Sequence, residues 1–194
     1  MTAGTIEIPG FSDPVTGAQT TFRAVLDAMA RPGRICPVNS GLRPPAPLDE
    51  ATAAVALTLF DQETAICLDA VMQAAAPWLT FHAGSPTVAD LGEADFVLAS
   101  RCPDLSQLQT GTDEAPEASA TLILQIGALG SGAAYRLAGP GLAAPFILRA
   151  TGLPDDFAAI WHRNHALFPR GVDMVICAGN RLAALPRSVK LEPA

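Results

Sequence analysis

The sequence has almost no lysine: eleven of its twelve basic residues are arginine, and Lys190 is the only lysine in 194 residues. Chemistry that needs an internal lysine is therefore nearly excluded, namely a pyridoxal Schiff base, a phosphate-loop lysine or an amine nucleophile. Charged residues are also few, at 16%, whereas apolar residues reach 49% and the mean hydropathy is +0.29. Disordered chains have the opposite composition, so a folded domain is expected.

Basic charge is scarce as well, since the net charge is −7 at pH 7 and the pI is near 4.8. Surfaces that bind nucleic acid or anionic membranes are basic, so neither partner is expected. The longest apolar runs, 51–60 and 121–126, fall far short of the roughly 20 residues of a membrane span. The first residues lack the basic start and apolar stretch of a signal peptide. The sequence therefore predicts a cytoplasmic protein.

Closely spaced metal ligands are missing too. The cysteines are widely separated, with no CxxC pair: Cys36, Cys67, Cys102 and Cys177. This spacing favours reduced, mostly buried thiols over zinc ligands or a disulfide. His162 and His165 lie one helical turn apart, but no third ligand is nearby and the His-Glu-x-x-His pattern is absent. We expect no metal site and no bound cofactor.

The apolar patterns predict a single α/β domain over residues 1–194, with a central mixed β-sheet flanked by helices. Helices are expected at 18–30, at 50–60 after a capping Asp49, and from Pro154 to about Leu167. Strands are expected at RICPV, AICLD, WLTFHA, DFVLAS, TLILQI, 133–138, PFILRA, VDMVICA and RLAALP, with a loop over 107–119. In the first helix, the spacing of four apolar residues predicts the buried face: Phe22, Val25, Leu26 and Met29.

Two kinds of side chain are candidates for chemistry. His82 lies at the end of the expected strand WLTFHA, where it could serve as a general base, although such a residue is more often a hydrogen-bonded structural histidine. Four arginines lie beside turns or strand ends: Arg31, Arg34, Arg170 and Arg187. Because the guanidinium group binds phosphate or phosphonate oxygens two at a time, these arginines suggest an anion site. Exposed arginines are usually just solvated, however, and the pattern leaves this alternative open.

Four ordered strings carry a resemblance that extends from about Phe11 to Arg187. They are FRAVLDAMARPG, LTFHAGSP, GTDEAPEASATLILQIG and FPRGVDMVICAGNRLAALPR. In order and interval they resemble the PhnH family, a subunit of the bacterial carbon–phosphorus lyase complex. The resemblance implies a part in phosphonate catabolism, in which an alkylphosphonate is joined to C1 of the ATP ribose and adenine is released. It also implies a fold similar to the large domain of pyridoxal-phosphate-dependent transferases without the cofactor, a homodimer, and docking to other subunits of the complex.

The resemblance also selects polar positions. The matching ones are Arg23, His82, Thr112, Glu117, Gln125, Arg136, Asp173 and Arg187, whereas Arg31, Arg34 and Arg170 match less well. Five of these are the candidates for binding a ligand or anion: Arg23, His82, Arg136, Asp173 and Arg187. The secondary candidates are Glu117, Gln125 and Arg170.

Three functional hypotheses follow. The leading one is an accessory subunit of the phosphonate–nucleotide transferase assembly, without turnover of its own. The alternative is a subunit with its own nucleotide or phosphonate site, in which Arg136 or Arg187 grips the anion and His82 or Asp173 moves protons. The third is a stand-alone hydrolase that shares only the fold.

Overall fold

A six-stranded mixed sheet forms the middle layer of the protein, in the order β1-β8-β7-β4-β3-β2. The computed structural model describes residues 7–194; residues 1–6, which begin the segment inspected for a signal peptide, lie outside the described part. The strands are β1 Cys36–Pro37, β2 Ile66–Leu68, β3 Phe96–Ala99, β4 Thr121–Gln125, β5 Ala128–Ala138, β6 Phe146–Thr151, β7 Asp173–Ala178, β8 Arg181–Leu185 and β9 Lys190–Pro193. Strands β2, β3, β4 and β7 are parallel to one another, whereas β8 runs antiparallel to β7.

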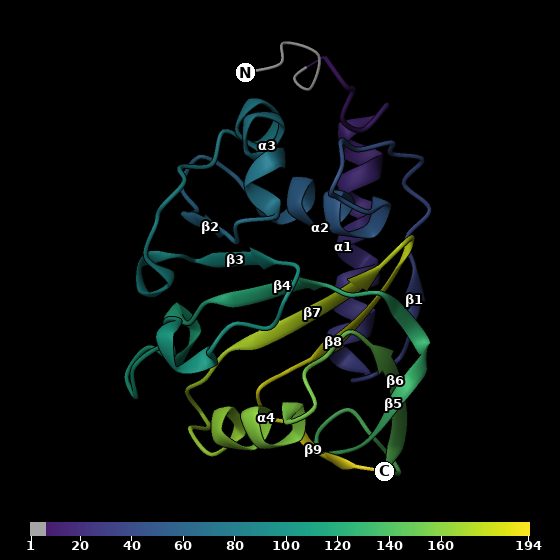
Figure 1. Cartoon of the computed structure of the whole chain (residues 1–194), viewed down its shortest axis with the longest axis vertical. Coiled ribbons are helices and arrows are strands. Elements are labelled where there is room, and N and C mark those ends of the chain that lie inside the picture. Colours follow the sequence, from purple (N-terminus) through teal and green to yellow (C-terminus); the bar gives the residue numbers. More distant parts are fainter. Residues whose placement is uncertain (1–6) are drawn as a thin grey trace.

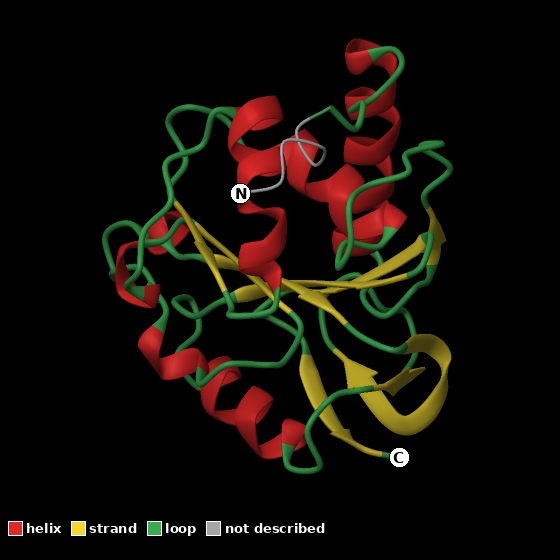
Figure 2. Ribbon diagram, turned by 45° about the horizontal axis from the view of Figure 1, so that its top comes forward, coloured by secondary structure: helices red, strands yellow, loops and turns green. Residues whose placement is uncertain are grey.

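The two faces of this sheet carry different elements (Figure 1). The helices are α1 Pro14–Ala30, α2 Glu50–Leu59, α3 Ala76–Ala83 and α4 Phe157–His165, with short 3₁₀ turns η2 Met72–Ala75, η3 Leu91–Glu93, η4 Leu105–Gln107 and η5 Pro116–Ala118. Helices α1, α2 and α3 cover one face, and α4 lies on the other face beside a second sheet (Figure 2). This second sheet is antiparallel, with the order β6-β5-β9. An α/β domain with a mixed sheet flanked by helices is therefore confirmed.

The core lies on both sides of β4. Leu122 and Leu124 belong to the apolar cluster shared with α4 and the small sheet, whereas Ile123 belongs to the cluster under α1, α2 and α3. Successive side chains of a strand point to opposite faces, so a strand covered on both sides needs an unbroken apolar run. The prediction that TLILQI and VDMVICA are fully buried strands is confirmed.

The WLTFHA prediction is wrong, because this stretch forms helix α3. Pro77 lies in the first turn, where its missing N–H costs no hydrogen bond, and Gly84 ends the helix with φ 73°. A short apolar run does not distinguish a strand from a buried helix. His82 therefore lies near the end of a helix and not at the end of a strand.

The predicted apolar face of the first helix is also wrong in part. The helix begins at Pro14, because the Asp13 carboxylate accepts hydrogen bonds from the first N–H groups. Its buried residues are Thr21, Val25 and Ala28, whereas Phe22 and Leu26 are exposed. The face toward the core therefore uses small residues, which allow α1 to pack closely on α2 and β8.

The second antiparallel sheet was not predicted. Its strand β5 begins before the expected residue 133, at Ala128, and contains an irregularity between Leu129 and Ala133. Gly130 and Gly132 have φ values of 91° and 87° there, which side chains with a Cβ rarely adopt. Strand β9 pairs with the edge of β5 that is opposite to β6. The two glycines thus lie at the irregularity of a strand that begins before the predicted one.

Candidate functional site

The carboxyl ends of the parallel strands are the edge where α/β proteins usually bind ligands. Asp69 follows β2, and its carboxylate joins this strand to β3. Oδ2 accepts hydrogen bonds from the Ser100 backbone N–H and hydroxyl at 2.6 and 2.7 Å, and Oδ1 accepts from the N–H groups of Val71 and Met72 at 3.0 and 2.8 Å. Partial burial opposes ionisation, but the four hydrogen bonds outweigh it and lower the pKa of Asp69. Asp69 is thus a structural link that is charged at neutral pH.

Gln125 holds the same edge at the end of β4. Its amide nitrogen donates to the Pro47 carbonyl at 2.8 Å, and its amide oxygen accepts from the Asp49 N–H at 2.8 Å. The Asp49 carboxylate accepts from the Gly179 N–H at 2.8 Å and makes no side-chain bond to its own helix. The expected helix-capping role of Asp49 is therefore wrong: the residue occupies the cap position, but its carboxylate binds the turn after β7.

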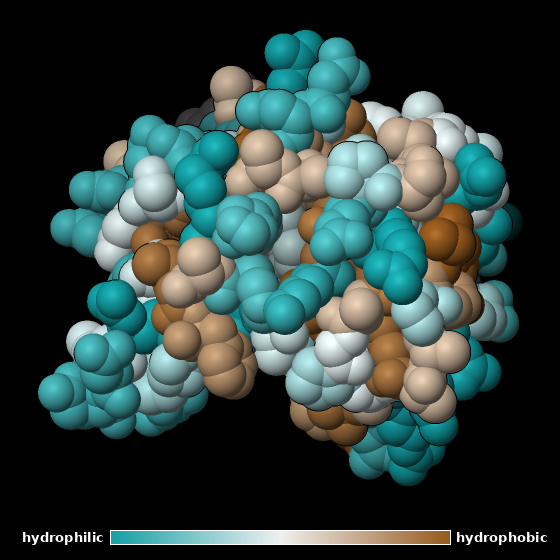
Figure 3. Space-filling view, turned by 90° about the horizontal axis from the view of Figure 1, so that it is seen from below, coloured by the Kyte–Doolittle hydropathy of each residue, from teal (hydrophilic) through white to brown (hydrophobic). Residues whose placement is uncertain are grey.

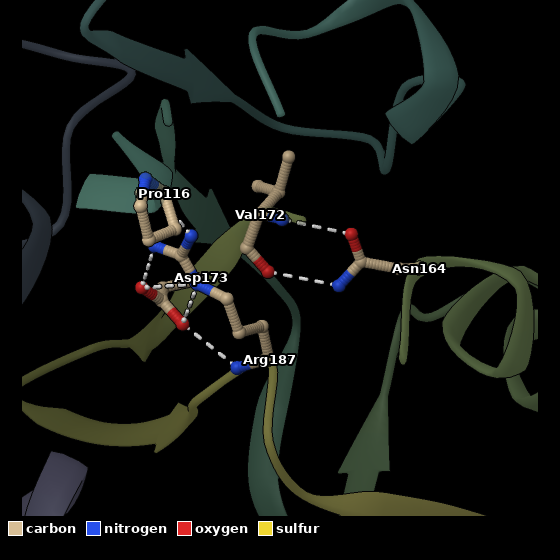
Figure 4. A network of polar contacts seen from close by, with 5 residues as sticks. All are labelled: Pro116, Asn164, Val172, Asp173 and Arg187. Atoms are coloured by element: carbon tan, nitrogen blue, oxygen red, sulfur yellow. Dashed lines mark hydrogen bonds and ion pairs between the residues drawn. The ribbon is translucent and has the colours of Figure 1, made fainter. Parts of the chain in front are cut away.

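Asp173 and Arg187 form the densest polar network near the predicted positions (Figure 4). The Arg187 Nε lies 3.2 and 3.1 Å from the two carboxylate oxygens, and its Nη2 lies 2.5 Å from Oδ2. Its Nη1 donates to the Pro116 carbonyl at 2.6 Å, and its backbone N–H donates to Asp173 Oδ1 at 2.7 Å. The exposed fractions of the two side chains are only 14% and 18%. Every nitrogen of the guanidinium is thus in contact with the protein itself.

Asn164 extends the contacts beside this network. Its amide accepts from the Val172 N–H at 2.8 Å and donates to the Val172 carbonyl at 2.9 Å, so that α4 is joined to the start of β7 (Figure 4). His165 Nδ1 lies 2.9 Å from the Arg187 carbonyl oxygen. Asn164 is buried, and sequence patterns did not select it. Through these contacts, α4 is linked by hydrogen bonds to the segments that contain Asp173 and Arg187.

His82 belongs to a separate cluster on α3. Its Nε2 lies 3.0 Å from the Ile8 carbonyl oxygen, to which the Trp78 Nε1–H also donates at 2.8 Å. The imidazole packs edge-on against Trp78 and Phe81, with ring centroids 4.8 and 5.0 Å away. In this arrangement His82 holds the chain segment that precedes α1.

The remaining predicted positions are scattered over the surface. Arg136 on β5 lies 3.6 Å from Glu192, and Arg170 lies 3.1 Å from Asp113. Arg23 is exposed on α1 and makes no ion pair with a carboxylate within residues 7–194. Thr112 and Glu117 are exposed in the 107–119 connection, where the Thr112 hydroxyl accepts a hydrogen bond from the Ala115 N–H at 3.0 Å. At the end of α1, Arg31 and Arg34 both form ion pairs with Asp27. The structure brings together Asp173 and Arg187 but not the full predicted set.

The cysteines provide no nucleophile at neutral pH. Burial raises the pKa of the Cys177 thiol to about 12, and burial with the nearby Asp156 and Asp104 carboxylates raises that of Cys102 to about 12. Burial also raises the pKa values of Cys36 and Cys67. A thiol reacts as its thiolate, so burial disfavours each of these groups as a nucleophile.

Comparison with known proteins places the chain in a family. The family model described as bacterial phosphonate metabolism protein (PhnH) matches residues 9–192. The "Alpha-D-ribose 1-methylphosphonate 5-triphosphate synthase subunit PhnH" of Rhizobium meliloti (strain 1021) is 40% identical over 187 residues, which cover 94% of each chain. HtxG of Stutzerimonas stutzeri, named as a candidate C-P lyase subunit protein, is 30% identical over 176 residues, which cover 89% of this chain and 85% of the relative. The chain therefore belongs to the PhnH family of bacterial phosphonate metabolism proteins.

Proposed function

We propose that this chain is an accessory subunit of a cytoplasmic carbon–phosphorus lyase assembly, in which an alkylphosphonate is joined to C1 of the ATP ribose and adenine leaves. The observation that carries the proposal is the 40% identity to a synthase subunit over nearly the whole of both chains. The chain acts as one α/β unit over residues 1–194. No helix within residues 7–194 is long and apolar enough to cross a membrane.

The charges favour a supporting role over catalysis by this chain alone. The reaction brings two polyanions together, and like charges about 4 Å apart repel by about 4 kcal/mol at an effective dielectric of about 20. A catalyst offsets this repulsion with preorganised positive groups. Here every guanidinium nitrogen of Arg187 contacts its own chain, Arg136 and Arg170 lie beside carboxylates, and the net charge is −7. Partner subunits supply the positive site in this proposal.

Likeness to the large domain of pyridoxal-phosphate-dependent transferases forms a second part of the proposal. It is supported by the four parallel strands with helices on both faces. The only lysine, Lys190, lies on β9 of the small antiparallel sheet and not on the central sheet. A Schiff base needs such an amine, so the chain works without this cofactor.

The exposed face of α1 supports a homodimer. Val15, Phe22 and Leu26 lie on one side of the helix, with exposed fractions of 67%, 45% and 51%. Phe22 lies at the middle of Pro14–Ala30, so an antiparallel pairing of two copies about Phe22 sets Val15 of one against Met29 of the other. It also sets the large Leu26 against the small Ala18. A twofold interface requires such self-complementarity.

Reconstitution tests the subunit role. The purified chain alone, given ATP and methylphosphonate, is expected to release no adenine, whereas its addition to the other purified subunits of the assembly restores release. Adenine release by the chain alone would instead support an active site of its own. Calorimetric titration of ATP and methylphosphonate into the isolated chain adds a second readout: binding heat at submillimolar concentration would favour the ligand-binding alternative, with Arg23 as an open cation.

A further inference from the structure

A groove of about 640 Å³ lies between the segment that follows β3 and helix α4. One wall is the 102–106 segment, and the other is the outer side of α4. The groove opens on the face that contains α4 and the small sheet; seen from below, that side of the molecule is hollowed, with apolar and polar patches side by side (Figure 3). None of the predicted site residues lines this groove. Asn164, which binds Val172 beside the Asp173–Arg187 network, also lines the groove.

The α4 wall has a regular pattern. Asp156, Ile160 and Arg163 line the groove at the spacing i, i+4 and i+7 that places residues on one side of a helix, and Leu167 lines it from the turn that follows α4. Asp156 and Arg163 are two turns apart, or about 10 Å along the axis. The wall therefore alternates negative, apolar, positive and apolar along its length.

The two charges on this wall are unpartnered. Asp156 precedes α4 at the cap position, but its carboxylate accepts no hydrogen bond from the helix. Within residues 7–194, neither Asp156 nor Arg163 forms an ion pair. Asp104 on the opposite wall is already engaged, because its Oδ1 accepts from the Ser106 N–H and hydroxyl at 3.1 and 2.8 Å. The pKa of Asp104 is lowered mainly by its hydrogen bonds with Ser106 and also by the nearby Arg163, so the positive charge of Arg163 acts across the groove without forming an ion pair.

We propose that this groove binds an amphipathic segment of another subunit of the assembly. That segment places a basic side chain at Asp156, an apolar side chain over Ile160 and an acidic side chain at Arg163. Charge complementarity of this kind fixes register and rejects wrong partners. The inference rests on the proposed function, since it gives the subunit a docking surface for its neighbour.

The shape of the groove argues against a second copy as the occupant. Each copy presents a concave surface, in which the 102–106 wall stands beside α4. Two concave surfaces leave a void between them, whereas stable interfaces are packed as closely as protein interiors. A convex segment from a different subunit fills the groove. The homodimer surface proposed for α1 lies on the opposite face of the central sheet (Figure 1).

Hydrogen–deuterium exchange tests the proposal on the assembled complex and on the isolated chain. Peptides that cover 102–106 and 156–167 are expected to exchange at least tenfold more slowly in the complex. The Arg163→Glu and Asp156→Arg variants are expected to weaken association at least tenfold while their melting temperatures fall by only a few degrees, because each reversed charge opposes the dipole of α4. Matched controls are Asp155→Arg, beside the groove but not lining it, and Arg149→Glu on β6; both associate normally.

The possible results separate the two proposals. A complex in which the groove peptides exchange as fast as in the isolated chain would overturn the docking site and leave the subunit role intact. Failure of the wild-type chain to associate at all would overturn both. Protection of the same peptides in the isolated chain by ATP or methylphosphonate would also overturn the docking site, because the groove would then be a ligand site.

Discussion

Arg187 and Asp173 hold the end of β8 against the beginning of β7 through a two-pronged ion pair, with Nη2 2.5 Å from Oδ2. The same guanidinium reaches the Pro116 carbonyl, so a single side chain joins three separate segments. Because both partners are mostly shielded from water, the loss of one leaves the other charged and poorly solvated. This relationship makes the pair a determinant of stability.

Asp173→Ala is expected to lower the free energy of unfolding by about 2–4 kcal/mol. The substitution leaves the Arg187 guanidinium without its carboxylate partner and removes the acceptor of the Arg187 backbone N–H. Urea denaturation at pH 7 measures the change. The matched control is Glu192→Ala, which removes the exposed carboxylate beside Arg136 and is expected to cost at most about 0.5 kcal/mol. Equal losses in the free energy of unfolding for the two variants would show that the Asp173–Arg187 pair stabilises the protein no more than the exposed pair does.

The buried strands β4 and β7 were predictable, because a strand that is buried on both faces requires a continuous run of apolar residues. The packed face of α1 was not, since Phe22 and Leu26 satisfy the helical spacing as well as Val25 does. Periodicity identifies an apolar side of a helix, but when a helix has two such sides, tertiary packing decides which one is buried. An exposed apolar side is therefore a signal of a partner.

The polar links had no such signal. Asp173 and Arg187 are 14 positions apart, and no local pattern pairs them. The residue types at Asp69 and Asn164 are common in turns and caps, so their long-range bonds to Ser100 and Val172 depend on the folded topology. The groove wall on α4 is different, because the spacing of Asp156, Ile160 and Arg163 is readable in the sequence. A search for mixed charged and apolar stripes would have found it.

The Gln125 amide offers a test of the carboxyl edge. Gln125→Glu is expected to destabilise the protein by about 1–3 kcal/mol, because a carboxylate cannot donate to the Pro47 carbonyl. Gln125→Ala removes both bonds and is expected to cost a similar amount. Thermal unfolding measures both effects, with Asn180→Ala in the exposed turn after β7 as the control. A glutamate variant as stable as the wild type would refute a donating role for this amide.

Asp69 is expected to make stability depend on acid pH. Its folded pKa lies below the unfolded value of about 3.9, so its contribution is complete above that pH and is lost as the pH falls through the folded pKa. Asp69→Asn is expected to cost about 1–3 kcal/mol at pH 7, and the gap to the wild type should narrow from pH 5 to pH 2. Denaturation curves at several pH values measure this gap, with the exposed Asp155→Asn as the control. A gap that is constant with pH would contradict the role of the charge.

The apolar side of α1 gives the sharpest test of the homodimer. Burial of Phe22 and Leu26 against a second copy stabilises the dimer by about 1.5–3 kcal/mol for each side chain. A carboxylate at either position opposes dimer formation, because burying an unpaired charge is costly. Phe22→Glu combined with Leu26→Glu is therefore expected to halve the mass measured by light scattering, from twice 20.1 kDa to 20.1 kDa. Both side chains are exposed in the single chain, so its melting temperature should change little.

The control for this double variant is Thr20→Glu, which adds a charge to an exposed position on a different side of the same helix. It is expected to keep the doubled mass, because residue 20 lies about 140° around the helix from Val15. If both variants stay dimeric, the dimer uses another surface. If the wild type itself has the mass of one chain at micromolar concentration, the exposed side of α1 must be covered by a different subunit, since an apolar stripe of this length is rarely left to water.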